Sequence, residues 1–200
     1  MTQKKRTGKS KTKAKSLRPR SEEMRKETFS HKNYSITDIT NPSLVKALTT
    51  DDINSILHPY DMFKGAYPCD LVPLSSDNEC SQAFIVNTGK SHTDGQHWTG
   101  LIIQQKQCWF FDSFGDEILS MDLLRSLQKI GIRKYMYNSK QIQSYNTVSC
   151  GHFCIAFILA HISKEKFHNF LQEFSVNTNA NENICLRLID VYLSTYFMNY

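Results

Sequence analysis

Apolar and polar positions in the middle of the chain follow a strand-like pattern. Residues 83–87, AFIVN, form an apolar run before a polar turn segment, and residues 97–115, HWTGLIIQQKQCWFFDSFG, hold two apolar runs around a Gln-Gln-Lys-Gln tip. Two such runs joined by a short polar tip are typical of a β-hairpin. Residues 133–138, RKYMYN, predict a further strand. Residues 58–80 are interrupted by proline and glycine and predict a loop.

Helical patterns lie on both sides of these strands. Residues 41–48 predict a helix with Asn41 as its N-cap and Pro42 at its first position, and residues 49–57 predict a second helix. Ser120 is the expected cap of a helix with a leucine-rich face, and the C-terminal third of the chain is helical by periodicity. Strands flanked by helices predict an α+β fold, for which we expect a central, mostly antiparallel sheet.

Positive charge is concentrated at the N-terminus. Of the 24 Lys and Arg residues in the chain, nine lie within the first 20 positions, which hold no acid. The remaining 15 bases and 19 acids leave the rest of the chain at a net −4. The nine basic residues are Lys4, Lys5, Arg6, Lys9, Lys11, Lys13, Lys15, Arg18 and Arg20. A segment with so few apolar residues cannot offset the entropy cost of ordering. Residues 1–33 are therefore predicted to be a disordered basic tail, followed by one domain over residues 34–200.

Two functions fit a tail of this kind. A flexible polycation binds the phosphates of DNA by releasing counterions, without reading the base sequence. The run KKRTGK at residues 4–9 also fits a nuclear localisation signal. The sequence leaves both interpretations open.

The chain has no apolar core of a secretory signal, and its longest uncharged apolar stretch, residues 153–162, is too short to cross a bilayer. We therefore expect an intracellular protein that is not secreted, has no membrane partner and keeps its six cysteines as thiols. A zinc site is the alternative use of the cysteines and histidines near Cys150. Structural zinc usually takes two short ligand pairs, and no second pair is present, so no metal is expected.

Cys150 and Cys154 have different expected roles. The segment SYNTVSCGHFC, residues 144–154, places Cys150 at the start of an apolar helix, where unpaired amide groups and the helix dipole stabilise a thiolate. Gly151 leaves room for a substrate carbonyl to approach the backbone. Cys154 lies one turn later, as a core cysteine does. Because a lone cysteine is more often a core residue, the assignment of Cys150 as a nucleophile facing a cleft depends on its neighbours.

His97 and Asp112 lie on the two arms of the predicted hairpin. A turn of two or four residues at its tip sets them opposite each other or one diagonal step apart, on the same face of the sheet. A carboxylate beside an imidazole fixes the tautomer of the ring and stabilises its charged form. A turn with an odd number of residues would place them on opposite faces. His97 would then be a half-exposed strand residue and Asp112 a turn former.

Gln143 precedes Cys150 by seven positions in a predicted loop. A side-chain amide from such a loop can act with the backbone N–H of the nucleophile to bind the oxyanion of a tetrahedral intermediate. Gln141 competes for this role, and a solvated loop glutamine would have none.

Three segments, AFIVNTGKSHTDGQHW, CWFFDSFG and QSYNTVSCGHFC, bring His, Asp, Gln and Cys in that order. Together they resemble the adenovirus-type cysteine proteases, within the wider group that includes the SUMO-deconjugating proteases. The resemblance extends from Phe63 to Phe157, is weaker in the C-terminal helices and is absent from the basic tail.

The resemblance implies a papain-like-clan cysteine protease fold and a role for each residue of the site. It implies His97 as general base, Asp112 as its orienting acid, Cys150 as nucleophile and Gln143 in the oxyanion hole. Trp98 would line the cleft beside the histidine.

Two departures limit what the resemblance implies. Adenoviral enzymes mostly have Glu where this chain has Asp112, although Asp is usual in the SUMO-protease branch. Adenoviral members also accept an activating viral peptide through a disulfide, whereas the matching region around Ile132 has no cysteine. The sequence therefore requires no cofactor and argues against a covalent peptide activator. DNA, which some members use, stays open as a cofactor.

Members of this group mature virion proteins, often at Gly-containing sites. The compact size and the lysine-rich tail fit a protease of a DNA virus, a virophage or a virus-like transposon. Such a protease would act on capsid or core precursors in the virion and in the infected cell, in the nucleus or a cytoplasmic virus factory. Three other classes stay open: a SUMO- or ubiquitin-like deconjugating protease, a thiol acetyltransferase, and a non-enzymatic basic DNA-binding virion protein.

Overall fold

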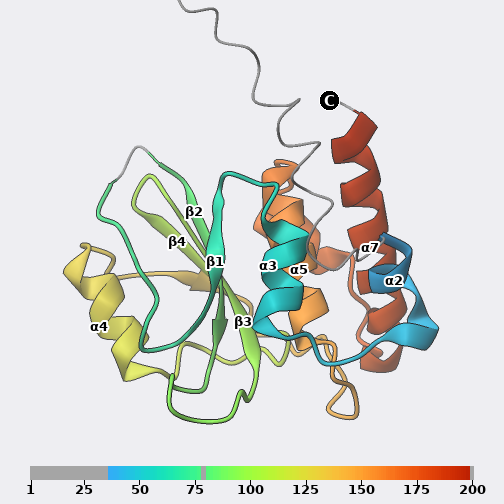
Figure 1. Cartoon of the computed structure of the whole chain (residues 1–200), viewed down its shortest axis with the longest axis horizontal. Coiled ribbons are helices and arrows are strands. Elements are labelled where there is room, and N and C mark those ends of the chain that lie inside the picture. Colours follow the sequence, from blue (N-terminus) through green and yellow to red (C-terminus); the bar gives the residue numbers. More distant parts are fainter. Residues whose placement is uncertain (1–35, 78–79, 199–200) are drawn as a thin grey trace, which may run out of the picture. The chain divides into compact units, whose positions relative to one another are not determined.

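The computed structural model describes residues 36–77 and 80–198, which belong to one compact unit (Figure 1). The predicted basic tail and its nine Lys and Arg residues lie outside the described residues. Among the helices of the described part, none combines the length and the apolar character that a membrane span requires.

Five strands form a mixed sheet in the order β1-β2-β3-β4-β5. The strands are β1 Phe63–Pro68, β2 Gln82–Asn87, β3 Trp98–Gln104, β4 Gln107–Phe111 and β5 Met136–Tyr137. The pairs β2–β3 and β3–β4 are antiparallel, whereas β1–β2 and β4–β5 are parallel. The α+β class is confirmed, and the expected antiparallel pairing holds for the central pairs only. Both edge strands are joined to the sheet by long connections, which parallel pairing requires.

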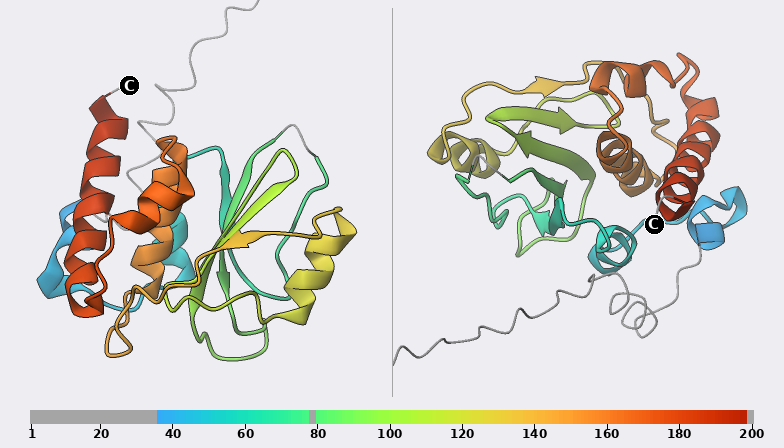
Figure 2. Two further views of the ribbon diagram at one scale, coloured as in Figure 1. Left: turned by 180° about the vertical axis from the view of Figure 1, so that it is seen from behind. Right: turned by 90° about the horizontal axis from the view of Figure 1, so that it is seen from above.

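Helices cover both faces of the sheet (Figure 2). Helix α4, Met121–Lys129, covers one face. The other face carries α5, Cys150–Ile162, and the helices around it: α2 Ile36–Thr40, η1 Pro42–Leu44, α3 Thr50–Leu57, α6 Phe167–Gln172 and α7 Thr178–Met198.

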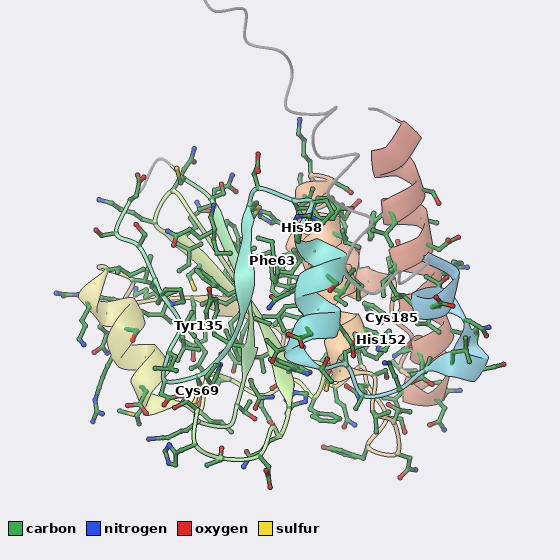
Figure 3. All side chains as sticks on the ribbon, viewed as in Figure 1. His58, Phe63, Cys69, Tyr135, His152 and Cys185 are labelled. Carbon is green, nitrogen blue, oxygen red and sulfur yellow. The ribbon has the colours of Figure 1, made fainter. Side chains whose placement is uncertain are left out.

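Adjacent residues of each central strand point to opposite faces, so the sheet separates two apolar cores. Ile85 and Phe111 belong to the core on the α5 side, whereas Phe84 and Phe110 belong to the core on the α4 side. Figure 3 shows Cys185 among the helices on the α5 side of the sheet.

Helix α5 is buried on every side along most of its length. All residues from 151 to 160 are buried, because β3 packs on one side of the helix and α7 on another. Gly100 in β3 permits this close approach, since a Cβ atom there would lie 2.6 Å from the Phe157 ring. Only the ends of α5 reach solvent, and Cys150 lies at one of them.

The strand predicted over residues 133–138 is only the two-residue β5, and the structure differs from the predicted elements in two further places. The predicted loop over residues 58–80 contains β1, which starts with an irregularity between Phe63 and Gly65 and is defined by its pairing with β2. The helix predicted over residues 41–48 is only the short turn η1, because Val45 is already extended. Its predicted N-cap is present.

Candidate active site

His97 lies directly before β3, at the end of a loop that Asn87 organises. The side-chain oxygen of Asn87 accepts hydrogen bonds from the backbone N–H groups of Gly89 and Gln96, at 2.8 and 3.1 Å. These two bonds close the loop over residues 88–96 and fix the point at which β3 begins. The position of His97 therefore follows from the local structure of the chain.

Asp112 directly follows β4, whose hairpin with β3 has a two-residue turn. The turn residues 105–106 have φ angles of 50° and 64°, in the left-handed region that tight hairpins use. The register pairs Gly100 with Phe111, which sets His97 one diagonal step from Asp112. Nε2 of His97 lies 2.9 Å from Oδ1 of Asp112. The predicted pairing of these two side chains is present.

Asp112 is only 4% exposed, and further hydrogen bonds hold both its carboxylate and its backbone. The backbone N–H of Phe114 donates to the same Oδ1 at 2.7 Å. Asn138, directly after β5, accepts from the Asp112 N–H at 3.0 Å and donates back to its carbonyl. Sequence reasoning missed Asn138, although a polar residue at the end of an apolar strand was a visible signal.

Cys150 is the first residue of α5, and its side chain is half-buried. The N-cap residue Ser149 makes no side-chain hydrogen bond to the helix. Burial raises the pKa of the Cys150 thiol, but hydrogen bonds with the His97 ring and the Trp98 backbone outweigh burial and lower the pKa below its usual value. The positive end of the helix dipole acts in the same direction. The first turn of α5 therefore favours a thiolate.

The His97 ring is hydrogen-bonded to the Asp112 carboxylate and interacts with the Cys150 thiol. Because Nε2 faces Asp112, Nδ1 is the ring nitrogen left for the thiol. Burial disfavours the charged ring, but the hydrogen bonds to Asp112 and Cys150 outweigh it and raise the pKa of His97 to about 9. A lowered thiol pKa beside a raised imidazole pKa favours a thiolate–imidazolium pair.

Gln143 is buried, with 1% of its surface exposed, and its amide group is fully engaged. Its Oε1 accepts from the Ser113 hydroxyl at 2.6 Å, and its Nε2 donates to the carbonyl and hydroxyl oxygens of Thr147, both at 3.1 Å. Gln141 instead donates to the Gln143 carbonyl at 2.8 Å. The two glutamines therefore differ in their partners: the Gln143 amide bonds to Ser113 and Thr147, and the Gln141 amide bonds to the backbone of Gln143.

Trp98 and Gly151 pack against each other. Trp98 is 9% exposed, and its indole N–H donates to the Leu48 carbonyl at 2.8 Å. A Cβ atom on Gly151 would lie 3.2 Å from the Leu48 side chain and 3.4 Å from the Trp98 ring. The absence of a side chain on Gly151 thus serves this packing. The predicted contacts of both residues with substrate stay predictions.

The other cysteines and histidines of α5 do not join the site. Cys154 is fully buried and donates its thiol hydrogen to the Trp98 carbonyl at 3.2 Å, as expected for a packing residue. His161 lies at the far end of the helix against Gln104 and Trp109. Within residues 36–77 and 80–198, no three His, Cys, Asp or Glu side chains are grouped as a metal site would need.

Comparisons with known proteins give a family match and a similar solved structure. A family model described as adenovirus endoprotease matches residues 63–180. Curated protein sequences give no significant match. Among solved structures, the crystal structure of the Se-Met ASFV pS273R protease is similar, with 14% sequence identity and a TM-score of 0.46, over 70% of this chain and 67% of that chain.

The family match extends over more than half of the chain and includes His97, Asp112, Gln143 and Cys150. The chain therefore belongs to the adenovirus endoprotease family and is a cysteine protease.

Proposed function

We propose that this protein is an endopeptidase that cleaves viral precursor proteins, with Cys150 as nucleophile, His97 as general base and acid, and Asp112 orienting His97. The observation that carries the proposal is the His97 ring, which is hydrogen-bonded to Asp112 at 2.9 Å and lowers the pKa of the thiol at the start of α5. A cysteine at a helix N-terminus, an imidazole beside it and a carboxylate behind the imidazole together make an activated thiol nucleophile.

In the proposed mechanism the Cys150 thiolate attacks the carbonyl carbon of the scissile peptide bond, and the carbonyl oxygen becomes negatively charged. Protonated His97 gives its proton to the leaving amine, the C–N bond breaks, and a thioester remains on Cys150. Neutral His97 then takes a proton from a water molecule, whose oxygen attacks the thioester and releases the acid product and the thiolate. Asp112 keeps the ring oriented through both steps.

We assign the oxyanion site to the backbone N–H of Cys150 and the side-chain amide of Gln143. In the free protein Nε2 of Gln143 donates to Thr147, so substrate binding must redirect one of its N–H groups. The bond from Ser113 to Oε1 can hold the other end of the amide during this change. Gln141 is the other candidate donor; in the free protein the amides of both glutamines are bonded to the loop, so kinetics of the two alanine variants decides between them.

The proposed substrates are capsid or core precursor proteins of the virus or element that encodes the chain, cleaved in the virion or the infected cell. Membership in the adenovirus endoprotease family supports this choice. No cofactor is needed for the mechanism above, because the described residues supply the base, the acid and the nucleophile.

We further propose that the basic tail holds the protease on DNA. Nine positive charges without an acid in the first 20 residues support this partner. If six to nine charges engage a duplex, the logarithm of the binding constant should fall against the logarithm of salt concentration with a slope of about −5 to −8. Deleting residues 1–20 should remove this affinity and spare cleavage of a short peptide. Full affinity with an unchanged slope would place DNA on the folded domain.

Co-expression with the capsid precursors of the same genome tests the protease proposal. Mass spectrometry should find defined cleavage products with the wild type and none with Cys150→Ala. Cleavage of a SUMO fusion but not of the precursors would favour a deconjugating protease. Acetyl transfer from acetyl-CoA without peptide hydrolysis would favour an acetyltransferase. A Cys150 thiol that an activity-based probe leaves unlabelled would favour the non-enzymatic class.

A further inference from the structure

Three aromatic rings form a continuous stack that starts on His97. The Phe114 ring lies 4.7 Å from the His97 ring, centroid to centroid, with 26° between their planes. The Tyr145 ring lies 5.1 Å from Phe114, at 24°. Tyr145 ends the stack at the surface, with 74% of its area exposed. A row of parallel rings therefore leads from the proposed general base to solvent.

The stack joins two loops that the backbone holds together. Phe114 follows Asp112, whereas Tyr145 lies in the loop before α5. The backbone N–H groups of Ile142 and Gln143 both donate to the carbonyl of Ser113 at 2.9 Å. These two bonds tie the loops to each other, so the exposed Tyr145 ring has a defined position relative to His97.

The glycine that follows Phe114 shows how closely the two loops approach. A Cβ atom on Gly115 would lie 2.8 Å from the Lys140 carbonyl carbon and 2.9 Å from the Gln141 nitrogen. Its φ of 83° also suits glycine. No side chain separates the loops at this point, which lets their backbones approach closely.

The chemistry of the leaving group indicates what passes over this surface. In the proposed mechanism His97 gives its proton to the nitrogen of the leaving amine, which must come within hydrogen-bond distance of the ring. The chain that follows the scissile bond therefore leaves the reaction centre past His97, on whose ring the stack begins.

We infer that Phe114 and Tyr145 form a subsite for a large apolar or aromatic side chain at one of the first two positions after the scissile bond. This inference rests on the proposed endopeptidase function. Flat aromatic rings favour stacked or edge-on contact with another ring, and one well-filled apolar contact changes specificity by roughly tenfold. Tyr145 is then a specificity residue, and Phe114 both supports it and covers the His97 ring.

Cleavage of a proteome-derived peptide library, read by mass spectrometry on both sides of each cleaved bond, tests the subsite. The wild type should favour large apolar or aromatic residues after the scissile bond. In Tyr145→Ala the ratio of kcat/KM for a phenylalanine peptide over its glycine counterpart should fall about tenfold, with the preference before the bond kept. Tyr145→Phe should retain the ratio. Leu119→Ala, which removes a 75% exposed side chain outside the stack, should match the wild type.

Cleavage by Tyr145→Ala with unchanged preference after the bond would overturn the subsite and leave the proposed function standing. A change confined to the pH profile of Tyr145→Ala would also overturn it, because the stack would then only cover His97. The absence of any cleavage that depends on Cys150 would overturn the proposed function and the subsite with it.

Discussion

The first turn of α5 and the interior of the same helix each carry a cysteine, and the pKa values of the two thiols are shifted in opposite directions. Cys150 is half-buried, and its hydrogen bond with His97 lowers its pKa. Cys154, one turn later, is completely buried, and burial raises its pKa well above the usual value. The two cysteines differ because one has a partner that stabilises its charge and the other has none that does.

The two histidines beside them repeat the contrast. His97 has its pKa raised to about 9, because its bonds to Asp112 and Cys150 outweigh burial. His152 is 2% exposed, its Nδ1 atom has no hydrogen-bond partner, and burial lowers its pKa to about 4. Burial alone thus disfavours the charged form of a cysteine or histidine, whereas the interactions of His97 with Asp112 and Cys150 shift the pKa values of His97 and Cys150 toward their charged forms.

Cys150→Ala should have the largest effect. Removing the nucleophile should lower kcat by roughly 10⁵ or more, as removal of a nucleophile does in other hydrolases, while the fold is retained. Cleavage kinetics on a precursor that the wild type cleaves measures the loss of kcat, and thermal unfolding measures whether the fold is retained. Residual activity within tenfold of the wild type would show that another group carries the reaction.

Gln143→Ala should come next, with kcat lower by roughly 10² to 10³ and little change in KM, because the amide stabilises charge that develops only in the transition state. Gln141→Ala is the matched control, since it removes the other amide of the same loop, and it should change kcat far less. Steady-state kinetics separates the two constants. An effect of Gln143→Ala on KM alone would assign the residue to substrate binding.

His152 should make the fold sensitive to acid. Its pKa of about 4 in the folded protein lies below the unfolded value of about 6.5, so protonation favours unfolding. The free energy of unfolding is not reduced by this group above pH 6.5. As the pH falls toward 4, protonation of His152 in the unfolded chain lowers the free energy of unfolding by roughly 3 kcal/mol. Denaturant unfolding of His152→Leu should lack this part of the pH dependence.

His58→Leu, the same substitution at an exposed histidine, is the control for the effect of the substitution itself. Equal pH dependence in the wild type and His152→Leu would mean that the buried ring does not stay neutral.

Cys154→Ala should have the smallest effect. It removes a small buried side chain and its contact with the Trp98 carbonyl, so the free energy of unfolding should fall by about 1 kcal/mol with activity retained. Loss of activity in the correctly folded variant would contradict the division of roles between the two cysteines.

Local patterns predicted the parts of the site that lie on single elements. The tip of the hairpin predicted that His97 and Asp112 share a face, because strand register depends on the turn between them. The apolar run after Cys150 predicted the start of α5. The contact of His97 with Cys150 joins distant parts of the chain, and only the family resemblance indicated it.

Features that depend on long-range packing were not predicted. Strand β1 contains glycine and proline and is defined by its pairing with β2, so local propensity predicted a loop. The bonds between Asn138 and Asp112 join residues 26 positions apart. The stack of Phe114 and Tyr145 on His97 likewise depends on two loops meeting.

The rate of Cys150 alkylation by iodoacetamide as a function of pH tests the thiolate–imidazolium pair most directly. Exposed Cys80 is an internal reference in the same protein, read by mass spectrometry of the two peptides. Cys150 should reach its plateau rate at lower pH than Cys80, and His97→Ala should move its titration back toward that of an ordinary thiol. A Cys150 that titrates together with Cys80 in the wild type, or that is unaffected by His97→Ala, would contradict the account.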